Sequence, residues 1–509
     1  MLFRSTVYAL PRSLTLLLAV ALPLSAWAAP ADTKPMPLGM TVTTKSVKAR
    51  HYFEQGLAKE WTLHIQECLE NMRKAVVADP NFALAHVLLS TFSQDPIEQV
   101  SEMEKAVATK KYASREEQLI VEWFSNSSRG QWIPAIQAMN TALQQWPGHR
   151  ELQWLAGLWL TGQQQWARAI PVYQRTLRLD PEFPDAWNNL AYCYARTRQF
   201  DKAFAAMKKY TELLPAEPNP QDSFAEISRM AGSFEEAVSH YRASLTLDPN
   251  FIESQLGIGD TYALMGDEPR ARKEYAIAIG KTSKDDQARA VLWSIQAAAT
   301  YVREGDFDGA DAAFQTQAGQ AHENGFGNLE AQAYRSMAMY QKDSKKAAEW
   351  LAKAEATLDE KHKVAKQFVD QERAVILRTR VYRALQDSDL AAAGAALEQL
   401  RQLADTTNDG NVAMNLHSAQ GALLLVQGKI EEAIPLLEED DRNPYAMKGL
   451  VTAYEKAGRN ADAERTAQNL AGFNEPVMEQ ALVVPQFRKD RVAKKPDQQT
   501  TAIRGGRIL

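Results

Sequence analysis

Apolar residues recur along this chain at the spacing of amphipathic helices. In the stretch 184–217, Trp187, Leu190, Ala191 and Tyr194 fall at i, i+3, i+4 and i+7. Residues at that spacing share one face of an α-helix, which buries itself against a neighbouring element. The first half of this stretch is therefore predicted to be a helix with one apolar face.

A second apolar face follows within the same stretch. Ala203, Met207 and Tyr210 stand at i, i+4 and i+7, and Pro215 comes after them. Proline ends a helix because it lacks the amide hydrogen and clashes one turn back. Small residues at the eighth and twentieth positions of the stretch let two helices approach closely. The stretch is predicted to be a pair of packed helices joined by a turn.

The same landmarks return every 34 residues. A proline, an alanine and a bulky residue four places after that alanine keep this phase over four or five units. The prolines are Pro147, Pro181, Pro215 and Pro249; the alanines are Ala135, Ala169, Ala203, Ala237 and Ala271; the bulky residues are Met139, Tyr173, Met207, Tyr241 and Tyr275. A fixed period of this size indicates an array of stacked repeats.

Glycine marks the turn inside many of these units, five residues before the alanine. These glycines are Gly232, Gly266, Gly305, Gly428 and Gly458. Glycine at the end of a helix supplies a positive φ without steric cost, so we expect a left-handed turn at each of them.

With this period and these residues the chain resembles the tetratricopeptide repeat family. The resemblance implies an all-α fold: an α-solenoid, or right-handed superhelix, of tandem helix-turn-helix tetratricopeptide repeats. It covers roughly residues 49–475 and implies about a dozen helical hairpins. A unit at 49–82 places Cys68 in a slot for a small residue.

The repeat phase divides the chain. We expect an N-terminal repeat lobe at 49–285 and, because the spacing of the alanines then stretches, a divergent C-terminal repeat lobe with longer helices at 286–475. A signal peptide at 1–28 and a mobile leader at 29–48 are expected before them, and a basic, disordered tail at 476–509 after them. Seven basic against two acidic residues give 485–509 a local charge of +5.

Residues 1–28 have the composition of an export signal. Arg4 and Arg12 are the positive part, the run from Leu14 to Leu24 is a short apolar core, and Ala26-Trp27-Ala28 fits a cleavage site. A bilayer span takes about 20 apolar residues, and no other long apolar run is present. We expect secretion across the inner membrane, into the periplasm, and no membrane span in the mature chain.

The sequence contains no recognisable catalytic constellation. Eight histidines form no zinc-protease motif, and Gly257-Ile258-Gly259 lacks the third glycine of a nucleotide loop. Cys68 and Cys193, the two cysteines, are expected to be buried free thiols. The net charge is −5, whereas a protein that binds nucleic acid usually carries an excess of basic residues. We expect no enzyme activity, no cofactor, no metal and no nucleic-acid partner.

The candidate site comes from the resemblance, which places certain positions of each first helix on a concave groove. In this chain the wall so defined is apolar and aromatic near 120–160, mixed at 188–196 and acidic at 222–260. The candidate groove residues are Phe124, Trp154, Leu158, Asn188, Tyr192, Arg196, Asp222, Glu226, Arg229 and Asp260. The aromatic members have an alternative role as packing residues between helices.

Two functions fit these features. The first is an exported scaffold that binds a protein or peptide partner of unknown identity through its concave groove. The alternative is a ligand-sensing or regulatory subunit of a cell-envelope signalling or transport system. The basic tail is either solvated or in contact with an anionic surface or the acidic groove of a second copy.

Overall fold

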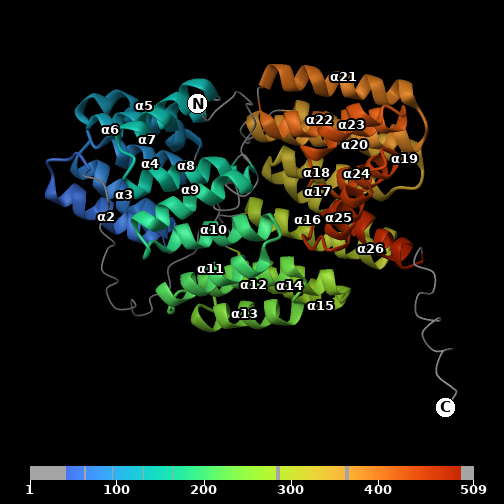
Figure 1. Ribbon diagram of the computed structural model, residues 1–509, viewed down its shortest axis with the longest axis horizontal. Helices are drawn as coiled ribbons and strands as arrows, with labels where there is room; N and C mark the ends of the chain where they lie inside the picture. The colour runs from blue at the N-terminus through green and yellow to red at the C-terminus, as the bar shows by residue number, and fades with distance from the viewer. Residues whose placement is uncertain are drawn as a thin grey trace, which may run out of the picture.

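The computed structural model describes residues 42–61, 65–93, 96–129, 131–162, 164–282, 287–360, 366–407 and 409–493 (Figure 1). Within these ranges the chain forms 25 α-helices and one short 3₁₀ helix, η1 (Lys110–Tyr112). The expected signal peptide at 1–28, most of the leader and residues 494–509 lie outside the described residues.

Successive helices pack as antiparallel hairpins, each of which also contacts the next. The first seven pairs are α2 (Val47–Trp61) with α3 (Ile65–Ala78), α4 (Ala83–Phe92) with α5 (Pro96–Thr109), α6 (Arg115–Ser128) with α7 (Trp132–Gln145), α8 (Arg150–Gly162) with α9 (Trp166–Leu179), α10 (Pro184–Arg196) with α11 (Phe200–Leu213), α12 (Pro218–Ala231) with α13 (Phe234–Leu247), and α14 (Ile252–Met265) with α15 (Glu268–Lys281).

The remaining pairs continue the array. They are α16 (Gln287–Glu304) with α17 (Phe307–Asn324), α18 (Gly327–Tyr340) with α19 (Ser344–Asp359), α20 (Lys366–Gln386) with α21 (Leu390–Thr407), α22 (Gly410–Val426) with α23 (Ile430–Glu438), and α24 (Pro444–Lys456) with α25 (Asn460–Ala471), followed by the single helix α26 (Met478–Ala493). The predicted helical solenoid of about a dozen hairpins is confirmed.

Close approach of two helices inside a hairpin depends on a small residue facing a large one. Gly157 of α8 lies against the fully buried ring of Tyr173 in α9: a Cβ added at Gly157 would lie 2.5 Å from Tyr173 Cε1. Gly259 of α14 faces Tyr275 of α15 in the same way: a Cβ added at Gly259 would lie 2.9 Å from the ring of Tyr275. The small eighth position and the bulky landmark of the sequence pattern are therefore the two sides of one contact.

The turns inside the hairpins have the predicted left-handed geometry. All five predicted glycines have positive φ, from 71° at Gly458 to 90° at Gly232. Two turns in the same 34-residue phase hold other residues in this conformation: Gln164 with φ 54° and Arg198 with φ 59°. A side chain there is unfavourable, because Cβ crowds the backbone.

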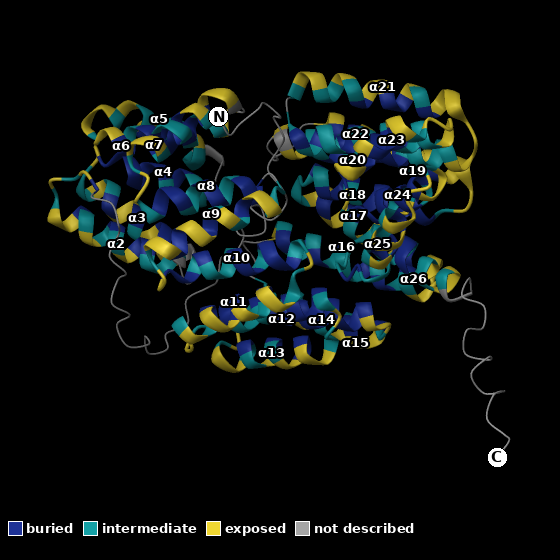
Figure 2. Ribbon diagram, in the orientation of Figure 1, coloured by how far each residue is buried: buried dark blue, intermediate teal, exposed yellow. Residues whose placement is uncertain are grey.

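The C-terminal half has the longer helices that its stretched spacing predicts. Helices α16, α17 and α21 have 18 residues and α20 has 21, whereas α12 to α15 have 14 each. Figure 2 shows burial along the helix faces that meet, while α13 and α21 expose one long side. Cys68 and Cys193 are buried free thiols, as predicted.

The expectation of a disordered tail from 476 is wrong for its first part. Residues 478–493 form α26, which contacts α16, α24 and α25. Val483 and Val484 of this helix are buried, at 6% and 0% exposure. The apolar residues of this segment form a helix face that packs against the array. The basic charge of the segment had suggested that the whole segment is solvated. Among the described residues, no helix combines the length and the apolar character needed to cross a bilayer.

We predict that Gly157→Ala destabilises the protein and that Gly319→Ala does not. The new methyl group at 157 would overlap Tyr173, and overpacking a core costs about 1–3 kcal/mol. Gly319, inside α17, has open space around it, so alanine there should add helix propensity. Thermal unfolding followed by circular dichroism measures both; equal melting temperatures would contradict the proposed close contact.

Candidate partner-binding wall

The first helices of successive hairpins lie beside one another and form a continuous surface. Helix α8 contacts α10, α10 contacts α12, and α12 contacts α14. We call this surface the inner wall; it consists of α6, α8, α10, α12 and α14. All ten candidate residues lie on these five helices, from Phe124 on α6 to Asp260 on α14.

The α6–α8 end of the inner wall is aromatic, as the sequence indicates. Phe124, Trp154 and Leu158 are half-buried. The ring of Phe124 stands 4.5 Å from that of Trp123, edge to face, and Trp154 lies 5.7 Å from Phe183. The contact of Trp154 with Phe183, which precedes α10, is the packing role expected for these aromatic residues. Their role in lining a groove stays a prediction.

Sequence reasoning passed over two residues at this end. Trp123 is buried, its ring lies 6.4 Å from that of Trp159, and its indole nitrogen has no hydrogen-bond partner. Trp123 stands at the eighth position of its repeat, where other units carry a small residue. A large aromatic residue at this position departs from the repeat pattern, and this departure could have identified Trp123 from the sequence.

The α10–α14 part of the wall is a connected polar network. The Tyr192 hydroxyl donates to Glu226 (2.7 Å), and Arg229 lies between Glu226 (3.5 Å) and Asp260 (3.1 Å). Tyr275 donates a further hydrogen bond to Asp260 (2.6 Å). The stretch predicted to be acidic is thus largely compensated by Arg229, which is 5% exposed. Buried carboxylates require such partners.

Asp222 and Asn188 complete the set on these helices. Ser254 Oγ donates to Asp222 at 2.6 Å, and burial raises the pKa of Asp222 to about 8, a rise that the Ser254 hydrogen bond only partly offsets. At neutral pH this carboxyl is therefore mostly protonated, which removes one more negative charge from the stretch. Asn188 Oδ1 is buried and accepts no hydrogen bond.

The middle of the inner wall is covered by the end of the same chain. We call residues 472–480 the C-terminal segment. Its Glu475 carboxylate pairs with Arg196 of α10 and with Arg442, which precedes α24, at 2.7 Å from Arg442 Nη2. Its Asn474 reaches the Met230 carbonyl of α12 at 3.5 Å. Arg196 is therefore engaged by an acidic residue 279 positions away rather than exposed on a free groove.

Glu475 closes the array onto itself. Arg196 and Arg442 each stand 5.7 Å from the ring of Trp166, the first residue of α9, so one aromatic ring and one carboxylate contact both guanidinium groups. A second bridge between the lobes joins the Gln164 amide to Met414 Sδ of α22 at 3.9 Å. The fourth and fifth hairpins and the last hairpins thus meet.

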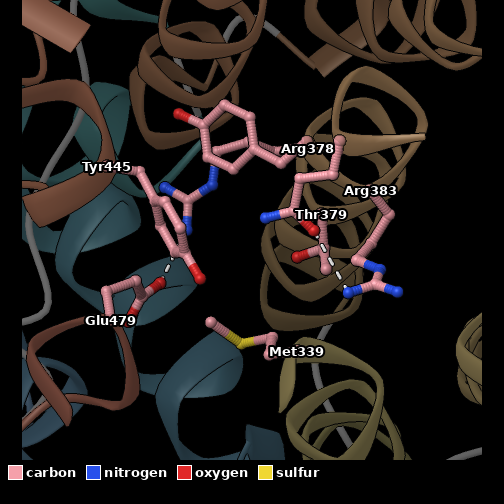
Figure 3. A pocket seen from close by; sticks show the side chains of 8 residues that line it. Met339, Arg378, Thr379, Arg383, Tyr445 and Glu479 are labelled. Carbon is pink, nitrogen blue, oxygen red and sulfur yellow. Dashed lines mark hydrogen bonds and ion pairs between the residues drawn. The ribbon is translucent and has the colours of Figure 1, made fainter. Parts of the chain in front are cut away.

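Further contacts fix the C-terminal segment to the other side of the array. Glu479 pairs with Arg378 of α20 at 2.8 Å, beside Tyr445 and Met339 (Figure 3). Gln480 is 1% exposed and accepts from Arg303 of α16. None of these pairings leaves a local pattern in the sequence, because the partners are far apart along the chain.

Two left-handed turns carry side chains where these long-range contacts occur. Gln164 forms the bridge to Met414, and Arg198 lies so near Gly472 that a Cβ there would be 2.7 Å from Arg198 Nη2. The turn at the next repeat, Gly232, faces Asn474. Two of these three turns hold a side chain that contacts another segment in place of glycine, and this break in the pattern was visible in the sequence.

Comparison with known proteins agrees with this architecture. Residues 160–218 match the tetratricopeptide repeat family. Superkiller protein 3 of Schizosaccharomyces pombe is 21% identical over 250 residues, which are 47% of this chain and 18% of that protein. Superkiller complex protein 3 of Mus musculus is 25% identical over 120 residues, 23% of this chain and 8% of that protein. The chain spans less than a fifth of the length of these relatives.

Solved structures of similar arrays include the APC/C hetero-tetramer Cut9-Hcn1, at 14% identity and a TM-score of 0.40, covering 83% of this chain and 76% of that one. The MamA protein matches at 18% identity and a TM-score of 0.29, covering 34% of this chain and 94% of that one. Its paired helices form an all-helical solenoid like that of tetratricopeptide repeats, and residues 160–218 match that family.

We predict that Glu475→Gln destabilises the protein at neutral pH and that this effect shrinks in acid. Burial alone would raise the pKa of Glu475, but the charges and hydrogen bonds of Arg196 and Arg442 outweigh it and lower the pKa to about 2. A lowered pKa stabilises the folded state above the unfolded value of 4.5, and this stabilisation is lost as pH falls toward 2.

At pH 7 the substitution should cost about 3 kcal/mol, the lower range for removing one partner of a buried ion pair. At pH 3.5 about 1.4 kcal/mol of the difference should be gone, one pH unit below the unfolded pKa. Denaturant unfolding at constant ionic strength measures this, with the exposed Glu431→Gln as control. A difference between wild type and Glu475→Gln that does not change with pH would refute the paired carboxylate.

Proposed function

We propose that this protein is an exported scaffold that binds a protein or peptide segment through its inner wall, in the periplasm. The observation that carries the proposal is the wall itself: five adjacent helices that present aromatic side chains at one end and a polar network at the other. Apolar anchors beside fixed polar groups are the usual composition of a recognition surface.

A catalytic role finds no support in the described residues. Groups of three or more metal-ligating side chains do not occur there. The carboxyl groups of the wall, such as Asp222 and Asp260, are engaged by Ser254, Arg229 and Tyr275.

Export rests on residues 1–28 alone. Their charge, apolar core and small residues before Ala29 have the order of a cleavable signal. Neither the fold nor the relatives bear on the compartment, so location is a separate part of the proposal with a separate test.

We predict that the triple substitution Trp154→Ala, Tyr192→Phe and Glu226→Gln abolishes partner capture without unfolding the protein. It removes an aromatic anchor and the hydrogen bond between Tyr192 and Glu226, both on the wall. Crosslinking in envelope extract followed by quantitative mass spectrometry should show at least a tenfold loss of specific partners, while the helical circular dichroism signal is retained.

The matched control places three similar changes on the outer helices: Ile133→Ala, Leu179→Ala and Glu235→Gln, at exposed residues of α7, α9 and α13. This control should capture the same partners as the wild type. Partners retained by the wall variant, or lost equally from both variants, would contradict binding through the inner wall.

We predict that the mature protein begins at Ala29. N-terminal sequencing and intact mass of the protein from the periplasmic fraction should show the loss of residues 1–28. Leu17→Arg places a charge in the apolar core of the signal, so the full-length precursor should accumulate in the cytoplasm. Recovery of uncleaved wild-type chain from the cytoplasm would refute export.

A further inference from the structure

The C-terminal segment meets the array through side chains that each face an arginine. Glu475 pairs with Arg196 and Arg442, Glu479 pairs with Arg378, and Gln480 accepts from Arg303. Four arginines from four different parts of the chain therefore converge on nine residues. Residues 473–477 within the segment form no helix or strand, and Glu479 and Gln480 lie in the first turn of α26.

Arg196 and Arg442 form a site that requires an anion. Both lie over Trp166, at 5.7 Å from its ring, and both are more than half-buried. Burial lowers the pKa of Arg442, and the nearby charge of Arg196 lowers it further. Two guanidinium groups held this close repel each other unless a carboxylate lies between them, and such charge-assisted pairs are strong and directional.

The second site has spare hydrogen-bonding capacity. Arg378 is 7% exposed, and its Nε has no acceptor although Nη2 holds Glu479. The Nε of the neighbouring Arg383 is also buried without an acceptor. Figure 3 shows both arginines around a narrow hollow with Thr379, Tyr445 and Met339, where Glu479 enters from α26. Arg378 also lies 3.7 Å from the buried carboxylate of Asp440, so it faces two carboxylates, and the two Nε donors remain for another acceptor.

We infer that these arginines are a recognition site for an acidic peptide segment with two carboxylates about four residues apart, and that the C-terminal segment occupies the site as a built-in competitor. One carboxylate binds between Arg196 and Arg442, and the other binds Arg378. This deepens the proposed function, on which it rests, by giving the partner a chemical class. The competitor remains tethered through the part of α26 that follows it, where Val483 and Val484 are buried.

The arrangement makes a quantitative expectation possible. A segment tethered beside its site has an effective concentration in the millimolar range, so an external peptide of the same sequence competes poorly. Weakening the tethered copy alone should open the site. The probe is a synthetic peptide of residues 470–482 with a fluorescein label, and the protein is the full chain.

Fluorescence anisotropy should show that the variant Glu475→Gln with Glu479→Gln binds the probe at least tenfold more tightly than the wild type. A probe with both glutamates replaced by glutamine should bind neither protein. Adding Arg442→Gln to the double variant should abolish binding of the original probe. As a control, Glu431→Gln with Glu432→Gln makes the same charge change at exposed positions of α23 and should behave as the wild type.

The inference would be overturned if wild type and double variant bound the probe with equal affinity. It would also be overturned if the probe with both glutamates replaced bound as tightly as the original probe. If the double variant does not fold, hydrogen exchange of the wild type decides: one millimolar probe should accelerate exchange in residues 472–480, and unchanged exchange counts against displacement. Loss of partner capture in the Trp154, Tyr192 and Glu226 variant tests the wall separately. The wall can therefore bind a partner even where this competitor mechanism fails.

Discussion

The closest contact in each hairpin, a small residue of the first helix against a large residue of the second, sets the geometry of everything built on it. Gly157 against Tyr173 and Gly259 against Tyr275 bring the two helices as near as their backbones allow. Interiors pack at nearly crystalline density, so one methyl group too many at such a point must displace a helix. Where successive units repeat this contact, their first helices lie on the same side, and α8, α10, α12 and α14 join in this way into the inner wall.

A stacked array of this kind has neighbours only along its length, and its stability is normally a sum of local terms. Here the Glu475 carboxylate adds a connection of another kind. It joins Arg196 of α10, which is 279 positions away, to Arg442 at the start of α24. The middle of the inner wall and the last hairpins are thereby linked through one carboxylate.

The sequence predicts the hairpins well because their determinants are local. The apolar spacing of 184–217 and the glycine turns at 232, 266, 305, 428 and 458 act within a few residues, and each was found where expected. Local patterns could not predict which segments cover the candidate site. That Arg196 is covered by Glu475 follows from how the array curves, which many small packing angles decide together. The one local trace of this contact was Arg198, where a turn that favours glycine holds a side chain that lies against Gly472.

The C-terminal segment follows the hairpins that it contacts along the chain, and this gives the folding of the molecule an order in time. A chain is made from its N-terminus, and domains fold as they emerge. The hairpins that carry Arg196 and Arg229 are complete more than two hundred residues before Glu475 is made. During that interval the C-terminal segment does not cover the inner wall. The newly made protein and the folded one therefore present different surfaces there.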